Sequence, residues 1–320
     1  MIDLIDPRRE RNVVVGAWSL TGLIGTGINH DKAIVVDRER AIVSNINLEL
    51  PSDPSARNSR KGQTWYQMGI EVHGEAARSV VLEMKTAWKH VGGFEASRGD
   101  RAPLIIDGKT RRSSLPELSE EPLPSQAANA CVPIVSLGRE VNSKDESSAN
   151  AGLLALFANA RERVRVLTPN LNARSALVGL ADATKHADVS VVVSKGFTET
   201  LENLPGQGGG NEEVVTRKLP ALIRERGGDP CKMHVRYFAR VEEPNKAVYG
   251  EAEGASHAKL ATADGAVVVI GSQNMDTQSW EVSRELSLAI DDRAVTAKFD
   301  TELDAVWQRA ACAFECGGCR

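Results

Sequence analysis

The chain has 320 residues, and 42% of them are hydrophobic, so it can bury one large or two medium cores and is not disordered. A net charge of −4 argues against a broad basic nucleic-acid surface but leaves room for a local basic groove. Five cysteines do not indicate a secreted disulfide framework, and we find neither a signal peptide nor an apolar run long enough for a membrane span. We therefore expect a cytoplasmic or peripheral membrane protein.

In chain order, the first part predicts strands joined by loops and followed by one helix. Hydrophobic and β-branched runs predict strands at 12–18, 30–36, 41–46 and 66–72. Helical spacing of apolar residues then predicts a helix over 74–91. Residues 94–127 are rich in Pro, Ser and charge with little periodicity, which is typical of a linker or a disordered insertion.

The rest of the chain alternates strands with helices, which favours a mixed, mainly parallel sheet covered by helices. The predicted strands are 131–137, 164–169, 189–194, 233–240, 257–262, 266–270 and 285–290. The predicted helices are 149–164, 173–187, 211–226 and 295–308. The fold class expected from this order is α/β.

Two stretches of the chain repeat one another. Each begins with the pattern H-x-K-x4-D and has an Asn seventeen residues after its His. The members are His30, Lys32, Asp37 and Asn47 in the first copy, and His257, Lys259, Asp264 and Asn274 in the second. When Gln67 is aligned with Glu285, the likeness continues through a strand and a helix, so we predict a duplicated domain.

The repeat also predicts the domain boundaries. Residues 1–93 form the first half, 94–127 the linker, 128–311 the second half and 312–320 a cysteine-containing tail. Only 29 residues precede His30, whereas about 129 separate residue 128 from His257. The first half is therefore expected to lack the opening strands and helices of the second.

The residue types of the motifs suit phosphate chemistry. His is a nucleophile or proton carrier near neutral pH, and a Lys two residues along a strand shares its face. Together with the donors Asn47, Asn274 and Ser272, this set can hold the non-bridging oxygens of a phosphate between two imidazoles. Attack and departure then lie in line, with a phosphohistidine between the two steps.

With G-S-x-N at 271–274, the duplicated motif resembles the phospholipase D superfamily. The sequences TPNLNARSAL, LPGQGGGNEEVV and GSQNMDTQSWEVSREL resemble a fungal phospholipase D-like, cardiolipin-synthase-like group. The resemblance covers residues 12–90 and 128–308. It implies two pseudo-twofold α-β-α domains and a metal-independent phosphodiesterase or phosphatidyltransferase that needs no cofactor.

The resemblance also implies roles for the site residues. His30 becomes the nucleophile and His257 the general acid; Lys32, Lys259, Asn47 and Asn274 bind the phosphate, Asp37 and Asp264 buttress the motif strands, and Glu285 holds His257. Two positions depart from the pattern. Gln67 stands in the place of Glu285, so His30 is expected to lack a carboxylate partner, and Asn45 replaces Ser272.

Several alternatives remain open. The chain is either an enzyme of the phospholipase D type or a non-catalytic relic that binds phosphate ligands, and a nuclease of the same superfamily and a metal hydrolase are further alternatives. Few aromatic residues favour phospholipid over nucleic acid as partner, with peripheral membrane contact. Hydrolysis and transfer are not separated by sequence, and the oligomeric state stays open. The tail, with C-x-x-C and Cys312, predicts a frayed, thiol-bearing terminus rather than a zinc site.

Overall fold

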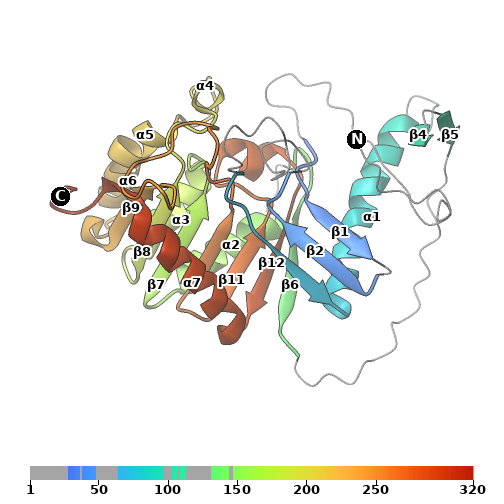
Figure 1. The fold of residues 1–320 in the computed structure, drawn as a ribbon, viewed down its shortest axis with the longest axis horizontal. Coiled ribbons are helices and arrows are strands. Elements are labelled where there is room, and N and C mark those ends of the chain that lie inside the picture. Colours follow the sequence, from blue (N-terminus) through green and yellow to red (C-terminus); the bar gives the residue numbers. More distant parts are fainter. Residues whose placement is uncertain are drawn as a thin grey trace.

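The computed structural model describes residues 28–36, 38–47, 64–96, 103–106, 109–112, 131–143 and 147–319. The predicted strand at 12–18, Asp37 and most of the predicted linker lie outside the described residues. The mixed α/β class is confirmed, with helices packed on a large sheet and a smaller sheet beside it (Figure 1).

Each motif contains the first strand of the same unit of three antiparallel strands and one helix. The first unit consists of β1 (Ala33–Val36), β2 (Arg40–Ser44), β3 (Gly69–His73) and α1 (Glu75–Ala96). The second consists of β10 (Leu260–Ala263), β11 (Val267–Gly271), β12 (Glu285–Asp291) and α7 (Arg293–Arg309). These elements confirm the strands and helices predicted around both motifs, with shifts of a few residues at their ends.

The two units also agree in register. Ala33 lies opposite Val43 in the first unit, and the equivalent residues Leu260 and Ile270 lie opposite one another in the second. The pairing of the second strand with the third agrees in the same way. The repeat expected from the sequence is therefore present at the level of these strands, whereas the boundaries of complete domains remain a prediction.

The second unit is part of an eight-stranded sheet with the order β13-β9-β8-β7-β10-β11-β12-β6. Its other strands are β6 (Ile134–Arg139), β7 (Arg163–Thr168), β8 (Asp188–Val193), β9 (Met233–Tyr237) and β13 (Ala311–Phe314). Among the described pairings of this sheet, only β7–β8 and β8–β9 are parallel. The expectation of a mainly parallel sheet is wrong, because β10 and β11 form a tight hairpin and β12 then returns antiparallel along β11.

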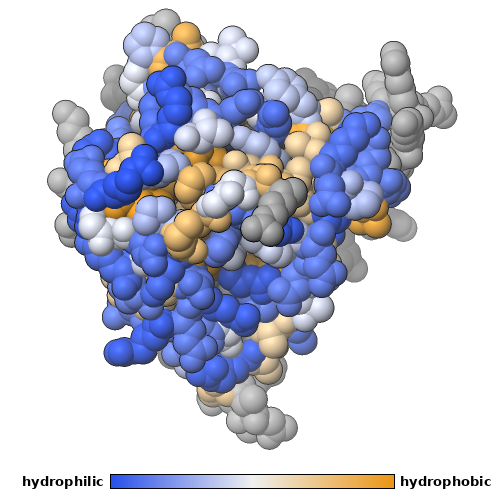
Figure 2. Space-filling model, turned by 90° about the vertical axis from the view of Figure 1, so that its left-hand side faces the viewer, coloured by the Kyte–Doolittle hydropathy of each residue, from blue (hydrophilic) through white to orange (hydrophobic). Residues whose placement is uncertain are grey.

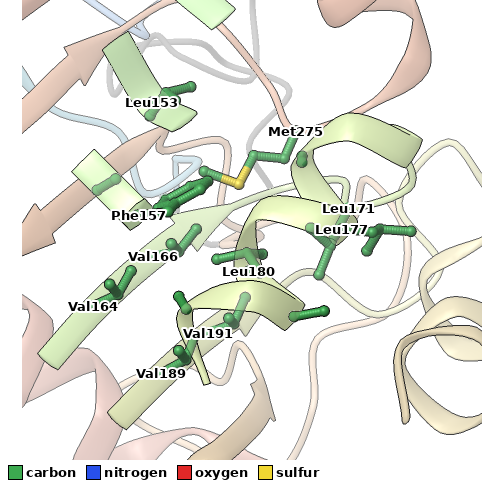
Figure 3. Close-up of a cluster of buried hydrophobic side chains, with 14 of the residues drawn as sticks. Leu153, Phe157, Val164, Val166, Leu171, Leu177, Leu180, Val189, Val191 and Met275 are labelled. Atoms are coloured by element: carbon green, nitrogen blue, oxygen red, sulfur yellow. The ribbon is translucent and has the colours of Figure 1, made fainter. Parts of the chain in front are cut away.

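Each face of the large sheet has its own hydrophobic core. The helices of this half are α2 (Ser148–Asn159), α3 (Arg174–Ala183), α4 (Glu199–Glu202), α5 (Asn211–Glu213) and α6 (Leu219–Glu225), with a π-helical turn, Val214–Lys218, joining α5 to α6. Val191 packs into the core under α2, α3 and α6 (Figure 3). The next residue, Val192, points to the opposite core, which α7 and the first unit cover.

Side-chain caps fix where two of these helices begin. The side chain of Ser147 accepts a hydrogen bond from the backbone N of Asn150 at 3.2 Å, which starts α2. Asp292 accepts one from the backbone N of Val295 at 2.7 Å, which starts α7 directly after β12. Each cap satisfies a backbone donor that the first turn of a helix leaves unpaired.

The segment predicted as a linker contains regular structure. Helix α1 continues to Ala96, and β4 (Pro103–Ile106) pairs with β5 (Lys109–Arg112) as an antiparallel hairpin. Residues 107–108 are Asp-Gly, a dipeptide that favours the tight turn of a hairpin. That dipeptide was the sequence signal for the hairpin, and the low periodicity of its surroundings obscured it.

The C-terminal tail is a strand held by disulfides. β13 pairs antiparallel with β9, and disulfides join Cys231 to Cys316 and Cys312 to Cys319. Cys131 is the free cysteine of the described residues. The prediction of a frayed, thiol-bearing tail is therefore wrong, because Cys231, distant in sequence, lies beside the tail.

The surface is mostly polar on the side of the molecule that lies at the left of Figure 1. Figure 2 shows this side, with hydrophilic residues over most of it and apolar residues gathered near its centre. Within the described residues, no helix combines the length and the apolar character needed to cross a bilayer.

Candidate functional site

The two motifs meet where the halves of the chain exchange backbone hydrogen bonds. The backbone N of His30 donates to the carbonyl of Arg284 at 3.0 Å, just before β1. In the same way, the backbone N of His257 donates to the carbonyl of Tyr66 at 3.0 Å, just before β10. Each motif His is thus fixed beside a strand of the other half.

This exchange decides the partner of each imidazole. The residue after Arg284 is Glu285, whose two carboxylate oxygens each lie 3.0 Å from His30 Nδ1. The expectation that Glu285 holds His257, and that His30 lacks a carboxylate, is therefore wrong. The sequence alignment pairs each downstream residue with the His of its own copy, but the backbone exchange brings it to the His of the other copy.

Glu285 is fully buried and has a second partner. Ser272 Oγ donates to Glu285 Oε2 at 2.6 Å, and Ser272 Oγ itself accepts from the backbone N of Leu286 at 3.0 Å. Ser272 thus supports the His30 pair. Burial tends to raise the pKa of Glu285, but the neighbouring His30 and Lys32 outweigh it and hold that pKa below its usual value.

His257 has neutral partners instead. Its Nδ1 lies 3.2 Å from the carbonyl oxygen of Asn45 and 3.4 Å from Gln67 Nε2. A carbonyl oxygen only accepts, so the contact with Asn45 requires the ring proton on Nδ1 and leaves Nε2 as the reactive nitrogen. Trp65 and Phe197 pack against the ring, with centroid distances of 5.2 and 5.7 Å.

The two imidazoles face one another across the junction of the halves. Their ring centroids are 6.5 Å apart and the rings are nearly perpendicular, at 88°. Burial lowers the pKa of His257, and the positive charges of Lys259, His30 and Lys32 lower it further. Burial also lowers the pKa of His30, although Glu285 acts in the opposite direction. The lowered pKa leaves the His257 ring neutral near pH 7 before an anion enters the site.

The two motif lysines have equivalent contacts. Lys32 Nζ donates to the carbonyl oxygen of His30 at 2.8 Å, and Lys259 Nζ donates to that of His257 at 2.7 Å. Each ammonium group is thus held beside its own motif His. Lys259 is 3% exposed, so its charge is poorly screened by water and is felt strongly at the site.

The motif asparagines differ in what the structure shows of them. Asn274 is partly buried, and its side-chain Nδ2 donates to Asp276 Oδ2 at 2.8 Å. Its backbone carbonyl accepts from Trp280 Nε1 at 3.0 Å. Asn47, its counterpart in the repeat, lies partly buried in the loop after β2. Their predicted contacts with a phosphate stay predictions.

Asp264 lies at the far end of β10 from His257. Its carboxylate accepts hydrogen bonds from the backbone N atoms of Arg161, Glu162 and Arg163 at 2.8, 2.9 and 2.9 Å. Burial would raise the pKa of Asp264, but these three donors lower it below its usual value. This geometry fits the predicted buttress and not a residue that meets the reacting atoms.

Sequence reasoning missed Arg284 as a joint between the halves. The side chain is fully buried; its Nε donates to Asp31 Oδ2 at 2.7 Å, its Nη2 to Glu83 Oε2 at 3.1 Å, and its Nη1 to Glu140. Asp31 directly follows the motif His, so the guanidinium fixes the segment that carries the His. The sequence signal for this contact was that Arg284 directly precedes Glu285 and Asp31 directly follows His30.

A second group that was missed lies beside Asn274. Asp276 and Glu202 are buried carboxyl groups, and Asn170 donates to both. These residues fall within the stretches TPNLNARSAL and GSQNMDTQSW and just before LPGQGGGN. Their contacts could not be predicted, because α4 and the loop after β11 are far apart in the chain.

Comparisons with known proteins support the family expected from the motifs. Residues 153–307 match a family model described as "Cardiolipin synthase, PLD-like domain". Cardiolipin synthase 1 of Bacillus cereus is 23% identical over 279 residues, which are 87% of this chain and 46% of the relative. The mitochondrial cardiolipin hydrolase of Xenopus tropicalis is 35% identical over 60 residues, 19% of this chain and 29% of the relative. The chain thus spans about half the length of the bacterial relative.

A solved structure shares the fold. The phosphatidylserine synthase of Haemophilus influenzae covers 90% of this chain, and the match covers 63% of that protein, with a TM-score of 0.55 and 15% sequence identity. At this identity the match concerns the fold alone. The duplicated motif and the family model matched by residues 153–307 support the phospholipase D superfamily as the family of this chain, with similarity to cardiolipin synthases.

Proposed function

We propose that this protein transfers a phosphodiester group through a phosphohistidine, with His30 as the nucleophile and His257 as the general acid and base. The observation that carries the proposal is the pair of facing imidazoles, of which His30 contacts a carboxylate and His257 has neutral partners among the described residues. A phosphate between the two rings has one nitrogen on each side, which suits in-line displacement.

In the first step, His30 Nε2 attacks the phosphorus while its Nδ1–H remains hydrogen-bonded to Glu285. A nitrogen–phosphorus bond forms, and the bond between phosphorus and the leaving oxygen breaks. The imidazole becomes a phosphorylated cation, which the ionised carboxylate stabilises by charge. The contact with Glu285 favours His30 over His257 as the nucleophile.

The leaving oxygen needs a proton, and His257 supplies it. The pKa of His257 is lowered in the empty site by burial and by the cations around it. A bound phosphodiester brings a negative charge next to the ring, which raises that pKa and favours the imidazolium. The carbonyl oxygen of Asn45 orients the ring through Nδ1–H, and the neighbouring Gln67 adds no charge.

In the second step, an acceptor hydroxyl replaces the leaving group. The now neutral His257 takes the proton of the acceptor, whose oxygen attacks the phosphorus as the bond to His30 breaks. Water as acceptor gives hydrolysis, and an alcohol gives transfer. Lys32, Lys259, Asn47 and Asn274 are proposed to hold the non-bridging oxygens in both steps.

Phospholipid is the proposed substrate, with peripheral contact to a membrane. The names of the relatives support this choice, because two are cardiolipin synthases and a third is a cardiolipin hydrolase. The alternative of a non-catalytic relic is weaker than the sequence suggested, because His30 does contact a carboxylate. A nuclease activity remains an outcome of the test.

The proposal is tested with vesicles of phosphatidylcholine containing fluorescent phosphatidylglycerol, with and without ethanol as acceptor. We expect phosphatidic acid without ethanol and phosphatidylethanol with it, both unchanged by EDTA, because the positive charges of Lys32 and Lys259 repel a metal cation. Loss of product in His30→Ala and in His257→Ala is expected. Binding to vesicles without turnover would instead indicate the relic, and cleavage of single-stranded DNA alone would indicate the nuclease.

A further inference from the structure

Two buried carboxyl groups lie together behind the phosphate-motif Asn274. Asp276 lies in the loop after β11 and is 3% exposed, and Glu202 ends α4 and is 7% exposed. Carboxyl groups are rarely so buried without strong partners. Neither residue belongs to the steps described above, so their burial needs a separate explanation.

Asp276 controls the orientation of the Asn274 side chain. Its Oδ2 accepts from Asn274 Nδ2 at 2.8 Å, and its Oδ1 accepts from the backbone N of Ser279 at 2.7 Å. A carboxylate oxygen accepts hydrogen bonds only, so it selects the nitrogen end of the Asn274 amide and disfavours the flipped amide. The backbone contact with Ser279 fixes Asp276 in turn.

Glu202 is bound to the same group through a shared donor. Asn170 Nδ2 lies 2.8 Å from Glu202 Oε1 and 3.5 Å from Asp276 Oδ2. Thr198 Oγ1 lies 3.2 Å from the first of these oxygens, and Asn172 donates to the other oxygen of Glu202. The two carboxyl groups are therefore parts of one hydrogen-bonded network.

The network also attaches the glycine-rich loop 204–210. The backbone N of Gly209 donates to the carbonyl of Glu202 at 2.9 Å, and Asn172 Nδ2 donates to the carbonyl of Gly209 at 3.0 Å. Asn172 Oδ1 accepts from the backbone N of Thr277, next to Asp276, at 2.8 Å. The loop and the segment that carries Asn274 are thus connected through the same side chains.

Two like charges in this position repel one another. Burial raises the pKa of Glu202 to about 7, and the charge of Asp276 adds to the effect. The pKa of Asp276 is likewise raised by burial and by Glu285, while His30 acts against the rise. The other side chains that contact the pair, Asn170, Asn172, Thr198 and Asn274, are neutral.

We propose that Glu202 and Asp276 are positioning residues that hold one proton between them and, through Asn170, keep the Asn274 amide and the glycine-rich loop in place at the phosphate site. Loss of that proton leaves two buried negative charges, which pushes Glu202 and its loop away from Asp276. The role of Asn274 as a phosphate donor rests on the proposed function, but the contacts of the network do not.

The first test needs no substrate. Trp280 Nε1 donates to the carbonyl of Asn274, so its indole N–H signal in a ¹⁵N-labelled protein reports on this loop. Trp280→Phe assigns the signal among the five tryptophans. We expect the wild-type signal to titrate with a midpoint near pH 7, and to lose that step in Glu202→Gln, which is neutral at every pH.

The second test measures phosphodiester turnover against pH. We expect wild-type kcat to fall roughly tenfold between pH 6.5 and 8.5 from the loss of this proton, and to fall much less in Glu202→Gln. The exposed Glu242→Gln variant serves as control and should keep the wild-type profile. Asp276→Asn should lower kcat at all pH values.

The outcomes separate this proposal from the proposed function. An indole signal that titrates in wild type and not in Glu202→Gln supports the network even in a protein without turnover. A Trp280 signal that does not change between pH 5.5 and 8.5, or that titrates alike in both proteins, overturns it. An active Glu202→Gln with the wild-type alkaline limb also overturns it.

Discussion

Glu285 follows His30 by 255 residues, and both of its carboxylate oxygens lie 3.0 Å from His30 Nδ1. The equivalent residue of the first copy, Gln67, lies 3.4 Å from His257 Nδ1. Each half of the molecule thus supplies the partner for the imidazole of the other half. His30 has a charged partner and His257 a neutral one, so the two histidines, which occupy equivalent positions in the repeat, are expected to have different roles.

Exchange of the two partners tests this assignment. Glu285→Gln removes the charge that stabilises the phosphorylated His30 ring. We expect kcat to fall at least tenfold, which corresponds to an activation free energy higher by about 1.4 kcal/mol or more. Gln67→Glu places a carboxylate beside His257, raises its pKa and moves the acid limb of the pH profile upward. Steady-state kinetics over pH 5–9 measure both effects.

The double variant Gln67→Glu/Glu285→Gln is the control for charge and composition, since it carries the same residues in exchanged places. We expect it to remain below wild type, with its phosphoenzyme less stable. Wild-type kcat in Glu285→Gln would contradict the assignment of His30 as the residue that depends on the carboxylate.

Asp264 is predicted to contribute to stability and not to chemistry. Asp264→Ala leaves three backbone N–H groups without their acceptor, which we expect to cost about 1–3 kcal/mol of unfolding free energy. Because its pKa is lowered in the folded state, this stabilisation is present above the unfolded pKa and is lost as the pH falls through the folded pKa. Thermal denaturation at pH 3–7 measures it.

A second variant separates the effect of backbone strain at residue 264 from the effect of the lost hydrogen bonds. Asp264 has a φ of 54°, which Asn tolerates better than Ala, so Asp264→Asn should be less destabilised. Both variants should keep kcat within a factor of about two at a temperature where they are folded, as surface substitutions do. A large loss of kcat in folded Asp264→Asn would show that the residue acts at the site.

Asp31 is predicted to lower the stability of the fold as the pH rises toward about 7. Burial raises its pKa to about 7 even though Arg284 acts to lower it. A raised pKa favours the folded state most below the unfolded pKa, and this contribution is lost as the pH rises through about 7. Between pH 6 and 7 we expect wild type to lose roughly 1 kcal/mol of stability that Asp31→Asn, which keeps an acceptor for Arg284, does not lose.

Urea denaturation at pH 6, 7 and 8 measures this difference. Glu71→Gln, an exposed carboxyl group on β3, is the matched control and should follow wild type. Equal slopes of stability with pH in wild type and Asp31→Asn would contradict the role given to Asp31.

Local patterns predicted most of the elements that hold the site. The short apolar runs in 41–46 and 266–270 and the apolar spacing in 295–308 led to β2, β11 and α7, because such patterns report directly on local structure. The two motifs identified the imidazoles that face one another. Sheet direction was predicted less well, since neighbours in a sheet are set by how the chain returns and not by any one strand.

Contacts between the halves were not accessible from the sequence. An alignment of the repeat assigns Glu285 to His257, and only the backbone hydrogen bonds between His30 and Arg284 reveal that it belongs to His30. The disulfide from Cys231 to Cys316 was missed for the same reason, because its residues are 85 apart in the chain. Such pairs depend on tertiary packing, which leaves no local periodicity.

The most direct measurement is the site of the covalent phosphoenzyme. His257→Ala, mixed with a p-nitrophenyl phosphodiester, should form the intermediate, because p-nitrophenolate leaves without a proton, and should release it slowly without the base. Alkaline quench, digestion and mass spectrometry then locate the phosphoryl group. We predict that it lies on His30 and that no such product forms in His30→Ala. Label on His257 in His30→Ala, or turnover by His257→Ala without any label on His30, would contradict the central claim.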